Sequence, residues 1–341
     1  MRIMGSMSHE WVTRLVTIMN APGIAASSPY DQPWLSLDEQ VDHLAARGLE
    51  FDSREDVTAA LTRIGYFRLT GYLRPFLRQR PGTPEDDTYA PGTTLEYILR
   101  LVDADRRLRQ IILDGVDRIE VSLRMRLGHT LGEVDPFAHL NVSTFDPTFV
   151  RRYKYARWLA GASENHQRSG EQFVRHYAEK YDGDLPIWAL VELLGLGQLS
   201  TMYDGLRDDL ATPIANDLGV PDRDLLRSWL AAINDIRNAA AHHVRLFNRY
   251  LVIAPMRPRN GSVPVLAHLA EHPGAEGHPS GGFRIYNVAA VIAYLTQRID
   301  PQSTWTADMS GFVASFPRHR LLGVDSMGFF DGWMFEEIWR G

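Results

Sequence analysis

The sequence contains no cysteine among its 341 residues. This absence excludes disulfide bonds, thiolate zinc sites and cysteine nucleophiles. It fits the reducing cytosol, where disulfides are rare, and we expect a cytoplasmic protein. Long apolar runs are also lacking, because the longest, Leu185 to Leu199, is short and interrupted by Pro186 and Glu192. Residues Met1 to Ser8 lack the apolar core of a signal peptide, so we expect no membrane association.

An excess of positive charge is the third feature that the sequence lacks. The chain holds 36 Lys and Arg residues against 42 Asp and Glu residues, for a net charge of −6. Proteins that bind nucleic acid over a wide surface are usually basic. An RNA site would therefore be a local patch, for which the arginine-rich stretch around Arg106 and Arg107 is a candidate. The alternative is a solvated helix face whose arginines pair with neighbouring acids.

Helical periodicity dominates what is present. Ser36 and Glu39 have the spacing of a capping box at a helix start. A longer apolar stripe with helical spacing runs from Thr94 to about Gly132. Alternating runs typical of strands are few, so the sequence predicts an all-α protein.

Aromatic residues and arginine alternate in a short segment from Gly65 to Pro75, which also contains Gly71. Tyr66, Arg68 and Tyr72 could stack RNA bases and contact phosphates. The alternative is a corner between two helices whose aromatic side chains belong to the core.

Four regions follow from composition and periodicity. Residues 1–30 are expected to form a loosely ordered arm, and residues 31–255 a helical core. Residues 256–284 are rich in Gly, Pro and His and are expected to form a loop or an insertion. A C-terminal helical segment, residues 285–341, completes the chain and begins with a predicted helix from Phe283 to Asp300.

One segment concentrates ionisable side chains among alanines, within a helix predicted from Asp224 to about Arg245. RNA cleavage without a metal needs a base for the 2′-hydroxyl proton and a cation for the phosphate. Histidine titrates near neutral pH and can act as the base, as His242 would. Arg237 would supply a permanent phosphate donor. Asn238, four residues before His242, lies on the same helix face and could orient the imidazole.

The spacing of Arg237 and His242 limits how they can act together. Five residues rotate a helix by about 140° beyond one full turn, so the two side chains do not share a face. They could converge at a helix end, through the reach of arginine, or across two copies of the helix. The last alternative implies a dimer with a composite site. A purely structural role for the histidines is equally compatible with the spacing.

At these residues the sequence resembles a known family. The pattern from Arg237 to His242 looks like the R-x-x-x-x-H signature of HEPN ribonuclease domains. The wider frame resembles bacterial abortive-infection proteins of the AbiD and AbiF kind, with a short echo at Met327 to Phe329. The resemblance is carried by five ordered blocks: Gln40–Leu49, Ile64–Leu73, Asp105–Arg126, Leu185–Ser200 and Arg237–Arg249.

The resemblance implies a HEPN-like helical bundle with additional N- and C-terminal helices. It also implies a metal-independent endoribonuclease, without cofactor or metal site, whose catalytic residues are Arg237, Asn238 and His242. It implies a homodimer, an RNA substrate and a small non-coding RNA or antitoxin partner, within phage defence. The alternative function is a non-catalytic module that binds RNA or a phage protein.

Further residues were predicted to support this site. His243 is a second candidate base, and Arg245 is a candidate for RNA binding. Glu120 and Arg124 lie four residues apart on the long helix, and either could reach the site. We favour an internal salt pair between them, which this spacing commonly produces.

Overall fold

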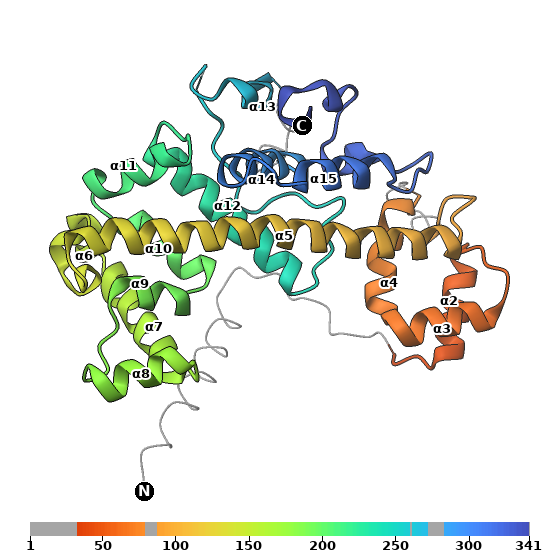
Figure 1. Cartoon of the computed structure of the whole chain (residues 1–341). Coiled ribbons are helices and arrows are strands. Elements are labelled where there is room, and N and C mark those ends of the chain that lie inside the picture. The colour runs from red at the N-terminus through yellow and green to blue at the C-terminus, as the bar shows by residue number, and fades with distance from the viewer. Residues whose placement is uncertain (1–32, 79–86, 260, 272–282, 341) are drawn as a thin grey trace, which may run out of the picture.

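The computed structural model describes residues 33–78, 87–259, 261–271 and 283–340. Over these ranges the chain is built from α-helices and short 3₁₀ turns, with isolated bridges in place of strands (Figure 1). This confirms the predicted all-α class. The arm predicted for residues 1–30 lies outside the described residues. No helix in the described ranges is both long and apolar enough to cross a membrane.

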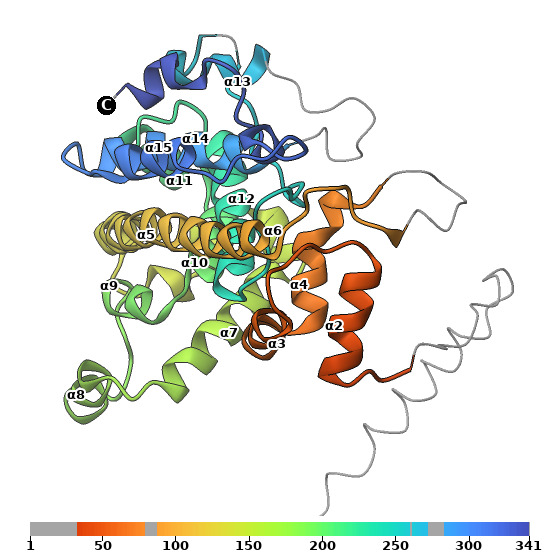
Figure 2. The same ribbon diagram turned by 90° about the vertical axis from the view of Figure 1, so that its right-hand side faces the viewer.

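Helix α5, Leu95–Val134, is the longest element, and several of the other helices pack along it (Figure 1). It begins where the apolar stripe predicted, because the Thr94 side chain accepts the backbone N–H of Tyr97 at 3.2 Å. Figure 2 shows this helix nearly end-on, with helices on several sides of it. Its buried face runs through almost the whole length of the helix, so α5 is the common surface for the rest of the fold.

The N-terminal helices lie at one end of α5 (Figures 1 and 2). The first begins with the predicted capping box of Ser36 and Glu39. Gly65 separates the second and third helices with a φ of 85°, a conformation that favours glycine. The elements are α2 (Leu37–Ala46), α3 (Arg54–Ile64), α4 (Tyr66–Leu73) and the 3₁₀ turn η1 (Arg74–Phe76).

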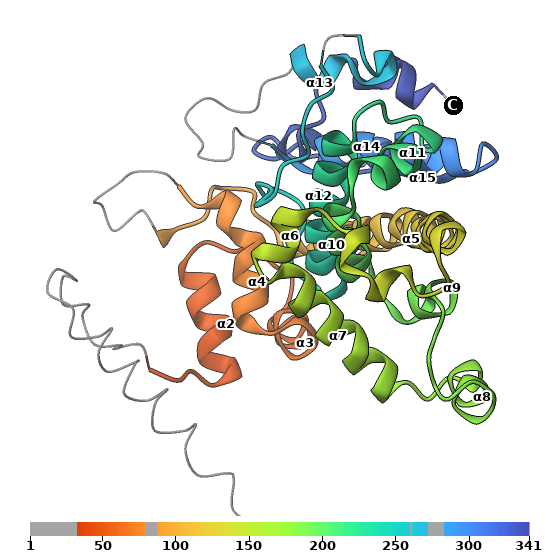
Figure 3. The same ribbon diagram turned by 90° about the vertical axis from the view of Figure 1, so that its left-hand side faces the viewer.

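A second group of helices covers the other end of α5 (Figure 3). The helix predicted from Phe149 to Ala160 is divided in two, because Tyr153 adopts a left-handed conformation with φ of 56°. The elements are α6 (Pro147–Arg151), α7 (Lys154–Arg168), α8 (Gln172–Lys180), α9 (Ile187–Leu190), the turn η5 (Val191–Leu193), α10 (Leu196–Gly205) and α11 (Asp208–Asp217).

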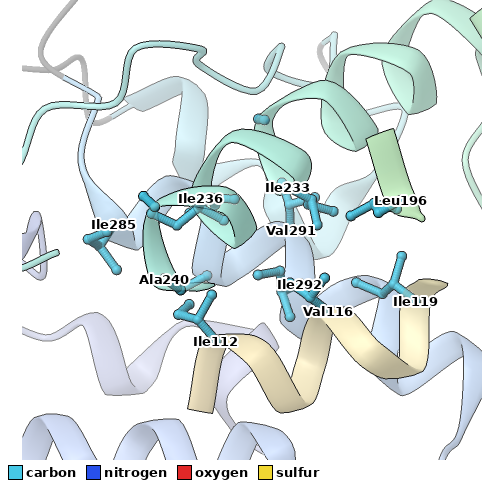
Figure 4. Packing of buried hydrophobic residues seen from close by; sticks show 14 of the residues in the cluster. Ile112, Val116, Ile119, Leu196, Ile233, Ile236, Ala240, Ile285, Val291 and Ile292 are labelled. Carbon is cyan, nitrogen blue, oxygen red and sulfur yellow. The ribbon is translucent and has the colours of Figure 1, made fainter. Parts of the chain in front are cut away.

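Helix α12, Arg223–Ala241, carries the predicted motif and packs against α5, α10 and α14. Figure 4 shows Ala240 of α12 facing Ile112 of α5 in a layer of buried apolar residues that also includes Ile236. The helix ends at Ala241, so the prediction that it continues to Arg245 is wrong. The motif thus straddles the end of a helix, and its last residues follow in a turn.

The C-terminal segment closes over the opposite side of α5 from α10. Gly115 of α5 allows this close contact, because a Cβ at this position would clash with the Trp305 indole. The Trp305 indole Nε1 donates to the Ile111 carbonyl at 2.7 Å. Within the predicted loop 256–284, the described residues include one 3₁₀ turn and one short helix. The elements are η6 (Pro264–Leu266), α13 (His268–Glu271), α14 (Ile285–Ile299), α15 (Trp305–Ala314), η7 (Val324–Met327), η8 (Trp333–Phe335) and η9 (Glu337–Trp339).

Candidate active site

Helix α12 ends in a Schellman motif, a C-terminal hydrogen-bonding pattern that usually employs glycine. The N–H of Val244 donates to the carbonyl of Ala239 at 2.8 Å, and the N–H of His243 donates to that of Ala240 at 3.1 Å. His243 takes the left-handed position with φ of 57°. This geometry satisfies carbonyls that the helix end would leave unpaired, and it turns the chain sharply after His242.

A buried carboxylate fixes the segment that follows this turn. Asp105 of α5 is fully buried, and its Oδ1 accepts the backbone N–H groups of Leu246 at 2.9 Å and Phe247 at 3.0 Å. Its Oδ2 accepts the Tyr72 hydroxyl at 2.8 Å and pairs with the Arg109 guanidinium. A buried charge is tolerated when it is paired in this way. Asp105 therefore joins α4, α5 and the post-helix segment at one point.

Two arginines hold the segment from either side. Arg68 Nη1 donates to the carbonyl of His243 at 2.7 Å, and Arg284 Nη1 donates to Asn248 Oδ1 at 3.1 Å. The side chains of His242 and His243 are exposed at the start of this segment. The two imidazoles are therefore presented to solvent on a backbone that is fixed from three elements.

The three predicted catalytic residues lie together at the end of α12. Arg237 is half-buried, and its Nη1 donates to Asn238 Oδ1 at 3.3 Å. His242 caps the helix, and its N–H donates to the Asn238 carbonyl at 2.9 Å. Arg237 and His242 are separated by about 7.5 Å along the axis, and no side-chain contact joins them in the described structure.

Glu120 and Arg124 form the ion pair that the sequence analysis favoured, and both are largely buried. Arg124 also donates from Nε and Nη2 to the carbonyl of Leu194, at 3.3 and 3.2 Å. Leu194 precedes α10, whose Gly197 lies against Asn234 of α12. The pair therefore supports the packing of α10 between α5 and α12, and it makes no contact with the described Arg237, Asn238 or His242 side chains.

The predicted RNA-binding tyrosines are both engaged within the protein. Tyr72 is buried, and its ring stacks on Phe247 with 5.6 Å between centroids. The hydroxyl of Tyr66 hydrogen-bonds Nδ1 of His43. Burial of Tyr72 leaves no face on which a base could stack, which agrees with the core alternative for this residue.

The predicted RNA-binding arginines fall into two groups. Arg68 and Arg245 lie beside the turn after α12, whereas Arg106 and Arg107 are exposed on α5. Arg106 lies 3.8 Å from Asp103 in an exposed pair, the neighbouring-acid arrangement considered for this stretch. The structure thus brings only two of the four to the candidate site.

Sequence reasoning missed Asp105, although the sequence does contain a signal for it. Asp105 falls on the apolar stripe of α5, between Leu101 and Leu108, where an acid is out of place unless it is paired. Phe67 was also missed, and its side chain is 91% exposed on α4. No periodic pattern distinguishes Phe67 from the buried aromatic residues around it.

The fold and the site define an all-helical protein with exposed histidines at a helix end that a buried carboxylate fixes. The family model for Abi-like proteins matches residues 59–248, which include α5, α12 and the Asp105 contacts. The chain belongs to the Abi-like protein family, and this membership supports a role in phage abortive infection. No significant match is found among curated proteins or among solved structures.

Proposed function

We propose that the chain is a metal-independent endoribonuclease of the HEPN type, acting in abortive infection of the AbiD or AbiF kind. The observation that carries this proposal is the position of Arg237 and His242 and their lack of a carboxylate partner among the described residues. Both lie at the end of α12, and neither is paired with a carboxylate among the described residues. A guanidinium and an imidazole without acid partners are available to a phosphodiester and its 2′-hydroxyl.

The proposed reaction is a transesterification. The neutral imidazole of His242 takes the 2′-hydroxyl proton, and the 2′-oxygen forms a bond to phosphorus. The bond from phosphorus to the 5′-oxygen breaks, and that oxygen takes a proton from water. The His242 imidazolium then gives its proton to the resulting hydroxide, which regenerates water and the neutral base. Arg237 stabilises the negative charge that builds on the phosphate oxygens. The products are a 2′,3′-cyclic phosphate and a 5′-hydroxyl end.

We further propose that the active form is a homodimer. The side chains of Arg237 and His242 leave the helix about 140° apart, which makes it difficult for one copy to hold both against one phosphate. Two helix ends facing each other would place the arginine of one copy near the histidine of the other. If the site is composite, mixing Arg237→Ala and His242→Ala proteins would restore cleavage, because a mixed dimer keeps one site with both side chains. If each copy acts alone, the mixture would not cleave RNA.

The central test uses purified protein and labelled RNA in excess chelator. Wild-type protein is expected to cut the RNA and leave a 2′,3′-cyclic phosphate, while His242→Ala abolishes cutting and retains the wild-type melting temperature. The matched control is His129→Ala, because His129 is an exposed histidine on α5. If the wild-type protein binds RNAs but cuts none, the non-catalytic alternative replaces this proposal, with an RNA, an antitoxin or a phage protein as its partner.

A further inference from the structure

Four arginines gather where α4 meets the segment after α12. Arg245 lies beside Gly71 of α4, where a Cβ would be in ordinary contact with Arg245 Nη1 at 3.8 Å. Arg245 in turn stands over the Phe247 ring at 5.2 Å and is near enough to Arg74 and Arg249 for their charges to act on it. Arg68 completes this arginine cluster, which is defined as Arg68, Arg74, Arg245 and Arg249.

The arginine cluster carries more positive charge than its surroundings neutralise. Asp105 is the acid that acts on Arg245, yet its oxygens are already occupied by Arg109, Tyr72 and two backbone N–H groups. Within the described ranges, no carboxylate pairs with Arg74, Arg245 or Arg249. Burial lowers the pKa of the Arg245 guanidinium, Asp105 and Tyr72 partly oppose this shift, and Arg74 and Arg249 add to it.

Unpartnered nitrogen atoms also indicate that positive charge in the arginine cluster is not fully neutralised. Arg245 Nη1 and Arg249 Nε are buried and make no hydrogen bond to any described group. Like charges held close together without acids are stabilised by a bound anion. The nearby C-terminal end of α12 carries partial negative charge, which disfavours an anion. The attraction for a phosphate in this region therefore comes from the arginines.

An exposed aromatic side chain shares a face with the arginine cluster. Phe67, Gly71 and Arg74 are spaced four and three residues apart along α4 and η1, so they lie on one side of the helix. Phe67 is 91% exposed, and Arg74 is also exposed. Arg245 fills the place over Gly71 between them. An aromatic ring beside cationic groups is the arrangement that binds unpaired bases and their backbone.

We infer that this face binds single-stranded RNA, with phosphates on the arginine cluster and an unpaired base stacked on Phe67. The inference rests on the proposed function for the identity of the ligand, and it adds the substrate class. A duplex cannot offer a base face to Phe67, because its bases are stacked on each other. Arg68 binds the His243 carbonyl, so RNA on this face would lie next to the exposed histidines.

The test measures binding separately from cleavage. The probe is a fluorescent single-stranded RNA with 2′-O-methyl groups throughout, which lacks the 2′-hydroxyl needed for cutting, and the readout is anisotropy. Phe67→Ala is expected to weaken binding about tenfold or more. Arg74→Ala is expected to weaken it and to reduce the slope of log affinity against log salt by about one.

Matched controls use exposed residues elsewhere. Phe335→Ala removes an exposed phenylalanine of η8, and Arg157→Ala an exposed arginine of α7, which lies at the other end of α5 from α4 (Figure 1). Both control variants are expected to bind the single-stranded probe as the wild type does. A duplex of the same length is expected to bind the wild-type protein more weakly than the single strand does. The inference is overturned if Phe67→Ala and Arg74→Ala bind like the controls, if duplex binds equally well, or if only an acidic protein binds this face. Because the probe cannot be cut, loss of catalysis alone leaves the inference standing.

Discussion

Oδ1 of Asp105 accepts the backbone N–H of Leu246 at 2.9 Å, although the two residues are 141 positions apart in the sequence. This hydrogen bond ties the first quarter of the family region, residues 59–248, to its end. The same carboxylate also holds Tyr72 of α4, so three separate segments depend on one buried charge. The histidines at the end of α12 are therefore positioned by a residue that has no chemical role in the proposed reaction.

Asp105→Asn is expected to lower the free energy of unfolding by about 3 kcal/mol or more. The substitution leaves Arg109 buried without its charge partner, and it replaces one acceptor with a donor. Urea unfolding followed by circular dichroism measures the change. Asp103→Asn is the control, because Asp103 is exposed two residues away, and we expect it to change stability by less than about 0.5 kcal/mol. Equal stabilities for the two variants would contradict the role given to Asp105.

His243→Gly is expected to raise the free energy of unfolding by about 1 kcal/mol, since His243 has a φ of 57°. His243→Val is expected to lower it, because a β-branched side chain fits this conformation poorly. Thermal melting measures both changes.

His242→Gly serves as the comparison for His243→Gly. His242 has an ordinary φ of −85°, so glycine brings it no conformational advantage.

If His242 is the base, His243→Gly also retains RNA cleavage. Loss of cleavage in His243→Gly with normal folding would transfer the catalytic assignment to His243.

Gly115→Ala is expected to lower the free energy of unfolding by about 1–3 kcal/mol. A Cβ at this position would lie 2.5 Å from Trp305 Nε1 and 2.6 Å from Ile292 Cγ2, so α14 and α15 would have to move. Gly311→Ala is the matched control, because a Cβ there meets nothing within 4 Å. This second substitution is expected to stabilise α15 by about 0.5–1 kcal/mol. Changes of the same sign in the two variants would disprove this account of the packing.

His139 is expected to make stability fall as the pH decreases. Burial lowers the pKa of His139 from 6.5 to about 4, so between these values the unfolded chain binds a proton that the folded chain does not. The stabilisation is complete above pH 6.5 and is lost progressively toward pH 4, by about 3 kcal/mol in total.

Urea unfolding at several pH values checks this prediction for His139. His139→Leu should flatten the dependence, because Leu keeps the volume and removes the titrating group. His129→Leu, which changes an exposed histidine, should leave the dependence as in the wild type. An unchanged slope in His139→Leu would show that other groups cause it.

Local sequence determined the helical class and several helix limits. The capping box of Ser36 and Glu39 begins α2, and Thr94 caps α5, where the apolar stripe starts. Gly65 separates α3 from α4 through its positive φ. These features could be predicted because each depends on residues within one helical turn of each other. The grouping of Arg237, Asn238 and His242 belongs to the same local class.

Tertiary structure alone decided where α12 ends and what surrounds the candidate site. Residues His242 to Ala254 include no glycine or proline, so nothing local predicts the stop. The turn at His243 is held by Arg68, and the next residues by Asp105, from segments 175 and 141 positions away. The arginine cluster and exposed Phe67 meet for the same reason. Long-range hydrogen bonds and buried charges leave no periodic trace in a sequence, so only the folded chain brings these groups together.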